Sequence, residues 1–115
     1  MIKVKDTNVL TGLMNHSVAQ PLDVIICDIY DRFEEIIITE SWRPSRHKND
    51  LHGLITLRAL DLRSWIYDDP QKVVDYVNNR WIYDPTRPEM MCCVYHDSGQ
   101  GDHFHIQVHP YTVNR

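Results

Sequence analysis

The sequence predicts an α+β domain in which a small, mainly antiparallel sheet carries helices packed on one side. Two segments repeat apolar residues at the period of an amphipathic helix. Four short runs, rich in β-branched and other apolar residues, have the length and composition of strands. Proline, glycine, serine and aspartate gather between these segments and indicate turns.

The two expected helices cover residues 18–33 and about residues 70–81. In the first, apolar side chains recur on one face and mostly charged side chains on the other. The second begins at a proline suited to the first helical position, Pro70, which follows a favourable N-cap, Asp69.

The four expected strands are residues 35–39, 57–62, 91–95 and 103–108. The last two form a hairpin, because residues typical of turns fill the segment between them. A polar, breaker-rich stretch separates the first two, and we expect residues 44–53 to form a loop over a cleft.

Composition predicts a single domain over residues 1–115 and excludes several classes of partner. Hydrophobic residues make up 43% and charged residues 24%, as in ordinary globular proteins. A net charge of −4 with scattered Lys and Arg offers no basic stripe for nucleic acid. No apolar run has the length of a membrane span and no signal peptide begins the chain, so we expect no membrane partner and cytoplasmic synthesis.

The three cysteines are expected to be reduced and buried. Cys92 and Cys93 are adjacent, which forbids an ordinary disulfide between them without severe strain. Cys27 lies in an apolar helical run, where we expect it to pack as a small hydrophobe.

Two histidines in one expected strand indicate a metal site. His103 and His105 are two residues apart, so strand alternation points both rings to one face. Asp61 lies in another expected strand, and His47 and His52 precede it. Two imidazoles and one carboxylate form a complete ligand set for a catalytic zinc that keeps one position open for water.

Three short blocks resemble a known family. They are residues 38–44 (ITESWRP), 58–62 (RALDL) and 103–108 (HFHIQV). Their order is similar to that of the zinc D-Ala-D-Ala peptidases and murein endopeptidases, whose fold is shared by the hedgehog signalling domain. The resemblance spans about residues 20 to 110. It implies that fold, a zinc cofactor and hydrolysis of peptide bonds in peptidoglycan stem peptides or cross-bridges.

The resemblance also implies roles for single residues. Asp61 and His105 match metal ligands, and His103 matches an auxiliary histidine of the site. Arg43 matches an arginine that positions a substrate carboxylate or carbonyl. Asp102 matches the acid that acts as general base, although an aspartate here can equally be a turn residue that orients His103. His96 and Asp97 flank the same turn as further candidates.

The first metal ligand is where the chain departs from the family pattern. That pattern sets a histidine seven residues before the aspartate, and this position is Leu54. Either His52 or His47 must therefore supply the imidazole. We favour His52, because it requires the smaller distortion and is followed by glycine, and His47 is the alternative.

Two functions follow as expectations. The first is a zinc peptidase that cuts peptidoglycan peptides in the periplasm or cell wall. Its origin is phage or bacterial, and a phage is suggested because the chain is compact and has neither a signal peptide nor a wall-binding module. The second is a non-catalytic zinc-binding domain with a structural or assembly role. The altered spacing before Asp61 and the lack of Glu at the base position favour the second.

Overall fold

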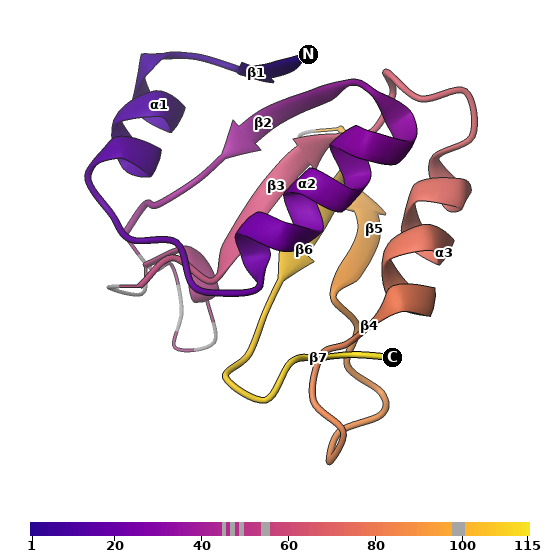
Figure 1. Cartoon of the computed structure of the whole chain (residues 1–115). Helices are drawn as coiled ribbons and strands as arrows, with labels where there is room; N and C mark the ends of the chain where they lie inside the picture. The colour runs from indigo at the N-terminus through magenta and orange to yellow at the C-terminus, as the bar shows by residue number, and fades with distance from the viewer. Residues whose placement is uncertain (45, 47, 49, 54–55, 98–100) are drawn as a thin grey trace.

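The computed structural model describes residues 1–44, 46, 48, 50–53, 56–97 and 101–115, and it confirms the expected α+β class. Five strands form one mixed sheet in the order β1-β2-β3-β6-β5 (Figure 1). Only the β1–β2 pair is parallel among the strand pairs of the described residues, which confirms a mainly antiparallel sheet. The strands are β1 Ile2–Val4, β2 Ile36–Glu40, β3 Ala59–Arg63, β5 Cys93–Asp97 and β6 Asp102–Gln107.

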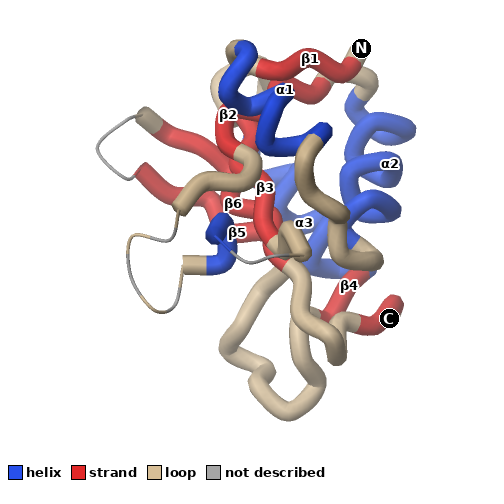
Figure 2. The backbone as a smooth tube through the Cα atoms, turned by 90° about the vertical axis from the view of Figure 1, so that its left-hand side faces the viewer, coloured by secondary structure: helices blue, strands red, loops and turns tan. Residues whose placement is uncertain are grey.

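Two helices cover one face of this sheet. These are α2, Leu22–Phe33, and α3, Pro70–Arg80, which Figure 2 shows on the same side of the strands. Asp69 caps α3 as expected, because its side chain accepts a hydrogen bond from the Gln71 amide. The first helix begins later than expected, since Val18 instead forms a β-bridge with Leu57.

The N-terminal elements were not expected from the sequence. Asp6 caps α1, Thr7–Met14, by accepting a hydrogen bond from the amide of Val9. This helix lies beside β1 and β2, apart from the layer formed by α2 and α3 (Figures 1 and 2). The expectation of helices on one side therefore holds for α2 and α3, while α1 closes one end of the sheet.

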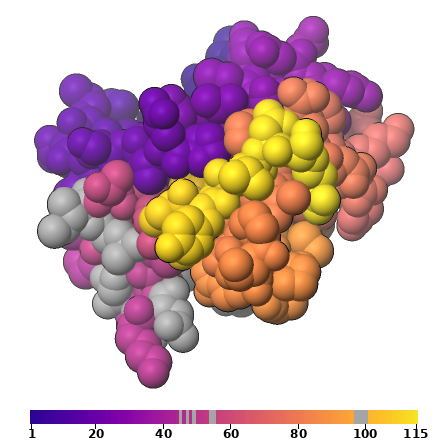
Figure 3. Space-filling model, turned by 60° about the horizontal axis from the view of Figure 1, so that its bottom comes forward, coloured from indigo at the N-terminus to yellow at the C-terminus, as the bar shows by residue number. Residues whose placement is uncertain are grey.

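A second, small sheet ties down the C-terminus. It pairs β4, Trp81–Ile82, with β7, Val113–Asn114. Figure 3 shows the C-terminal segment, in yellow, between the purple N-terminal part and the orange part that follows α3. No helix of the described chain combines the length and the apolar character needed to cross a membrane.

The expected burial holds for two of the three cysteines. Cys92 and Cys93 are buried in the core, whereas Cys27 is exposed, and all three are free thiols. Cys27 follows Ile25 and Ile26 in the chain, but two helical steps rotate it about 200° away from Ile25. The apolar run around Cys27 thus concealed a solvent-facing position.

Strand alternation gives the sheet two different faces. Phe104 and Ile106 are fully buried in the core beneath the helices. The intervening His103 and His105 face the opposite, open side of the sheet. Asp61 reaches the same side from β3, because it pairs directly with His105 in the strand register.

Candidate metal centre

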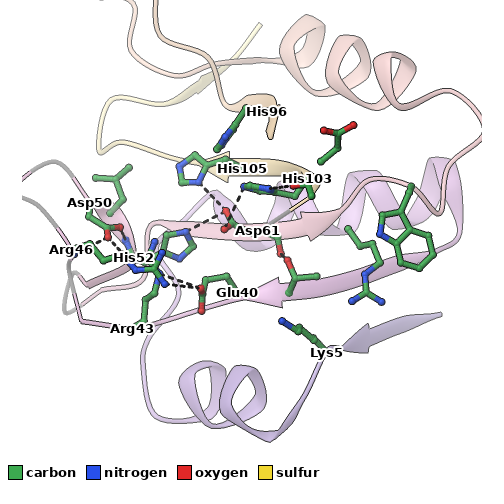
Figure 4. Close-up of a pocket in the computed structure, with 16 residues that line it drawn as sticks. Lys5, Glu40, Arg43, Arg46, Asp50, His52, Asp61, His96, His103 and His105 are labelled. Atoms are coloured by element: carbon green, nitrogen blue, oxygen red, sulfur yellow. Dashed lines mark hydrogen bonds and ion pairs between the residues drawn. The ribbon is translucent and has the colours of Figure 1, made fainter. Parts of the chain in front are cut away.

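A cavity of about 580 Å³ lies over the open face of the sheet. Side chains of β2, β3 and β6 line it, together with the segment that connects β2 to β3 (Figure 4). That segment contains a short 3-10 turn, η1, Leu51–Gly53. The expected loop over a cleft therefore contributes directly to the cavity wall.

Three of the predicted ligands meet in this cavity. His52, Asp61 and His105 each offer one ligand atom, and these atoms lie within 4.8 Å of one another. The Asp61 carboxylate is the shared centre: its Oδ1 lies 3.3 Å from Nε2 of His52 and 3.0 Å from Nδ1 of His105. This group has the composition that a metal ion with an open coordination position requires.

The outer nitrogen of each imidazole is fixed by a hydrogen bond. Nδ1 of His52 donates to the Ser41 carbonyl at 2.6 Å. Nε2 of His105 lies 3.1 Å from Oε1 of Gln107, whose amide nitrogen donates to the Met91 carbonyl at 2.8 Å. Since a carbonyl oxygen only accepts, the outer nitrogen of each ring carries a proton. The inner nitrogen faces Asp61, and it carries a second proton where it donates to that carboxylate or a lone pair where it binds a cation.

Electrostatics favour an ionised carboxylate at the centre of the group. Burial raises the pKa of Asp61, but hydrogen bonds from His105 and His52 outweigh burial and hold that pKa well below its usual range. Burial lowers the pKa of His52, yet the hydrogen bond and charge of Asp61 produce a net increase. At neutral pH Asp61 is therefore a charged ligand candidate, and a bound cation would replace protons shared with the histidines.

The structure brings His52 into this group, while His47 lies outside the described residues. His52 is 2% exposed, and its amide donates to Oδ1 of Asp50 at 3.1 Å. The same carboxylate accepts the amide of Arg46 at 3.0 Å. Asp50 thus fixes the backbone that presents His52, and these hydrogen bonds together with the Arg43 charge lower the pKa of Asp50 to about 2 despite its burial.

His103 occupies an auxiliary position beside the ligand group. Its Nε2 lies 3.8 Å from Oδ2 of Asp61, the oxygen that His52 and His105 do not contact. Its ring lies 4.4 Å, centroid to centroid, from that of His96. His103 therefore lines the cavity beside Asp61, in the position that the resemblance gives to the auxiliary histidine.

Asp102 does not join this group. It shares a strand face with Phe104 rather than with His103, and its Oδ2 accepts a hydrogen bond of 3.0 Å from the Tyr95 hydroxyl. Its backbone carbonyl accepts a further hydrogen bond from Ser64 at 2.8 Å. Asp102 also lines the cavity, but its carboxylate is engaged by Tyr95, and among the described residues it makes no hydrogen bond or ion pair with the groups around Asp61.

Arg43 is likewise engaged within the protein. Its guanidinium forms an ion pair with Asp50, and its Nε lies 3.2 Å from Oε2 of Glu40. Two carboxylates therefore compensate its charge, and Arg43 fastens the loop that carries His52 rather than presenting a free fork to substrate. Sequence reasoning missed these two acids, although Glu40 lies within the block that resembles the peptidases.

Comparisons with known proteins identify no family for this chain. No family model, curated protein or solved structure matches the chain. The resemblance to the D-Ala-D-Ala peptidases accordingly depends on the three sequence blocks, and the hedgehog-like fold stays a prediction within the α+β architecture described above.

Proposed function

We propose that this protein is a zinc-dependent peptidase that hydrolyses peptide bonds of peptidoglycan, in stem peptides or cross-bridges. The observation that carries the proposal is the convergence of His52, Asp61 and His105 on one point of an open cavity. Both imidazoles are already oriented by hydrogen bonds on their outer nitrogens, as is usual for histidines that bind metals. The proposed site of action is the periplasm or the cell wall, for an enzyme of phage or bacterial origin.

The residues around such a metal can be assigned separate roles in peptide hydrolysis. A bound zinc would polarise the peptide carbonyl and lower the pKa of a coordinated water. Asp61 contributes the negative charge of the ligand set, and the two imidazoles complete it. We assign proton transfer to His103 rather than to Asp102, because Nε2 of His103 lies 3.8 Å from Asp61, whereas the Asp102 carboxylate is hydrogen-bonded to Tyr95.

A non-catalytic zinc-binding domain with a structural or assembly role is the second candidate. Two residues expected to act on substrate are held elsewhere: Arg43 by Asp50 and Glu40, and Asp102 by Tyr95. A site that binds zinc but has no free arginine and no carboxylate base would favour this role. Both candidate functions require bound zinc, and they differ only in whether the protein cleaves peptidoglycan.

Zinc content of the purified protein is the first test. We expect one zinc per chain in the wild type, and loss of that zinc in His52→Ala, Asp61→Ala and His105→Ala. His109→Ala is the matched control, because His109 lies outside the cavity and should not affect zinc content. His47→Ala tests the alternative ligand in the same way. Absence of zinc from the wild type, even after reconstitution, would contradict both candidates.

Cleavage of purified peptidoglycan by the zinc-loaded protein then separates the candidates. Release of new amino groups by the wild type, with a strong decrease in His103→Gln at unchanged zinc content, would support the peptidase. Full zinc occupancy without cleavage across several peptidoglycan chemotypes would favour the structural role.

A further inference from the structure

The cavity contains two cationic side chains that do not serve the metal group. Lys5 follows β1, and Arg63 lies at the end of β3, two residues beyond Asp61. Alternation places Arg63 on the same face of β3 as Asp61, and it pairs with His103 in the register with β6. Figure 4 shows Lys5 well apart from the ion pairs around Arg43.

These two cations differ from the other basic residues of the cavity in lacking an acidic partner. Arg43 pairs with Asp50 and Glu40, and Arg46 lies 4.0 Å from Glu40. Within the described part of the chain, no carboxylate lies within ion-pair distance of Lys5 or Arg63. The protein has 16 acidic and 12 basic residues, so these cations are unpaired despite an excess of carboxylates.

Trp65 orients one of the two cations. The guanidinium carbon of Arg63 lies 4.9 Å from the centre of the Trp65 ring, and Arg63 is half-buried. Trp65 itself is 70% exposed at the cavity rim. Stacking against an indole limits the rotamers of the arginine while leaving its N–H groups available to an anion.

We propose that Lys5 and Arg63 bind a carboxylate of the peptide substrate, with Trp65 covering the neighbouring part of the chain. The inference depends on the proposed peptidase function, which it deepens by assigning an acidic substrate. Asp61 and Arg63 are two positions apart on β3, or about 7 Å at the rise of an extended chain. The carboxylate therefore belongs to a residue within about two positions of the scissile bond.

Each cation also has a simpler explanation. A lysine next to an edge strand discourages pairing with other chains, and an arginine stacked on tryptophan can be an ordinary surface contact. Neither explanation requires the two side chains to act together on an anion. A direct binding comparison distinguishes these accounts.

The experiment uses two capped alanine tetrapeptides that carry one glutamate or one glutamine at the same position. Binding is followed by two-dimensional NMR through the side-chain N–H signal of Trp65, assigned with Trp65→Phe. The titration is performed on zinc-loaded and zinc-free protein, because a carboxylate can also bind zinc directly. Lys5→Gln and Arg63→Gln are the test variants.

Lys3→Gln and Arg32→Gln are the matched controls. Lys3 belongs to β1 but does not line the cavity, and Arg32 on α2 stacks over Phe33 at 5.0 Å much as Arg63 stacks over Trp65. Each control removes the same charge, and the arginine control also removes a similar stacking contact, at a distance from the proposed site.

We expect the wild type to bind the glutamate peptide about tenfold more tightly than the glutamine peptide, as is typical of one charge-assisted hydrogen-bonded contact. Lys5→Gln and Arg63→Gln should lose this preference, and both controls should keep it. Equal binding of the two peptides by the wild type would overturn the inference. So would a preference that persists in both test variants, or one that disappears equally in the controls. If the wild-type protein binds no zinc or cleaves no peptidoglycan, the proposed function is refuted. The titration of the zinc-free protein still tests whether Lys5 and Arg63 bind a carboxylate.

Discussion

His52 and Asp61 are nine residues apart in the chain, yet Nε2 of the histidine lies 3.3 Å from Oδ1 of the aspartate. The peptidase pattern separates the corresponding residues by seven positions. The turn η1 holds His52 beside the end of β2, because the carbonyl of His52 accepts the amide of Arg43 at 3.2 Å. The ligand geometry is thus maintained by loop contacts rather than by sequence spacing.

Asp50 is the residue on which this loop geometry most depends. Its carboxylate accepts the amides of His52 and Arg46 and pairs with Arg43. We predict that Asp50→Asn weakens zinc binding about 10- to 100-fold, as is typical for residues that support metal ligands. Competition with a chromophoric chelator measures the affinity. Asp31→Asn, on the exposed side of α2, is the control and should bind zinc like the wild type; equal affinity in Asp50→Asn would assign the loop geometry to other contacts.

Gly12 connects the N-terminal helix to the same site. A Cβ at this position would lie 2.3 Å from Oγ of Ser41 and 3.0 Å from the backbone nitrogen of Trp42. Ser41 donates to the Val9 carbonyl at 2.8 Å, and its own carbonyl accepts Nδ1 of His52.

We therefore predict that Gly12→Ala destabilises the protein, although alanine would favour a helix by about 0.5–1 kcal/mol at an unconstrained position. It should also weaken zinc binding by displacing Ser41. Thermal unfolding and the chelator assay measure the two effects, with Thr11→Ala on the exposed side of α1 as control. A more stable Gly12→Ala with wild-type zinc affinity would show that α1 does not hold Ser41 in place.

The parts of the structure that could be predicted from sequence are those set by local periodicity. Alternation in β6 correctly placed His103 and His105 on one face, and the N-cap Asp69 fixed the start of α3. The same alternation places Asp102 on the strand face of Phe104, and its assignment as the base, which follows only from the resemblance, stays a prediction. The parallel pairing of β1 with β2 depends on contacts between residues distant in the chain, which periodicity does not encode.

The loop residues were unpredictable for a different physical reason. Arg43 has the same sequence context whether its guanidinium faces a substrate or an internal acid. The ion pair between Arg43 and Asp50 forms because of the backbone path of the loop. Irregular loops have no sequence periodicity from which that path could be predicted. Cys27 shows a different error, since the apolar run suggested burial although the helical period places this residue away from the buried face of α2.

The three cysteines should differ sharply in reactivity. Burial raises the pKa of both Cys92 and Cys93 to about 12, while Cys27 is exposed. We predict that Ellman's reagent labels about one thiol per folded chain and all three in denaturant. Cys27→Ser should abolish the reaction of the folded protein. Rapid labelling of two or more thiols under native conditions would contradict the burial of Cys92 and Cys93.

Asp84 should make folding stability depend on pH in the acidic range. Its Oδ1 accepts hydrogen bonds from the amide and hydroxyl of Thr86 at 2.9 and 2.8 Å, and its Oδ2 lies 3.0 Å from Nε of Arg87. The hydrogen bonds from Thr86, followed by that from Arg87, lower the pKa of Asp84 to about 2 in the folded protein. The unfolded value is about 3.9, so the folded state binds fewer protons between these values.

The sign of the effect follows directly from that difference. A carboxylate with a lowered folded pKa contributes stability that is fully present above about pH 4 and is lost as the pH falls toward 2. We predict that Asp84→Asn is less stable than the wild type in urea unfolding at pH 6, and that the difference decreases steadily between pH 4 and pH 2. Asp68→Asn, an exposed aspartate before α3, should show no such convergence. A stability difference for Asp84→Asn that stays constant across this range would mean that the hydrogen bonds of Asp84 do not depend on its charge.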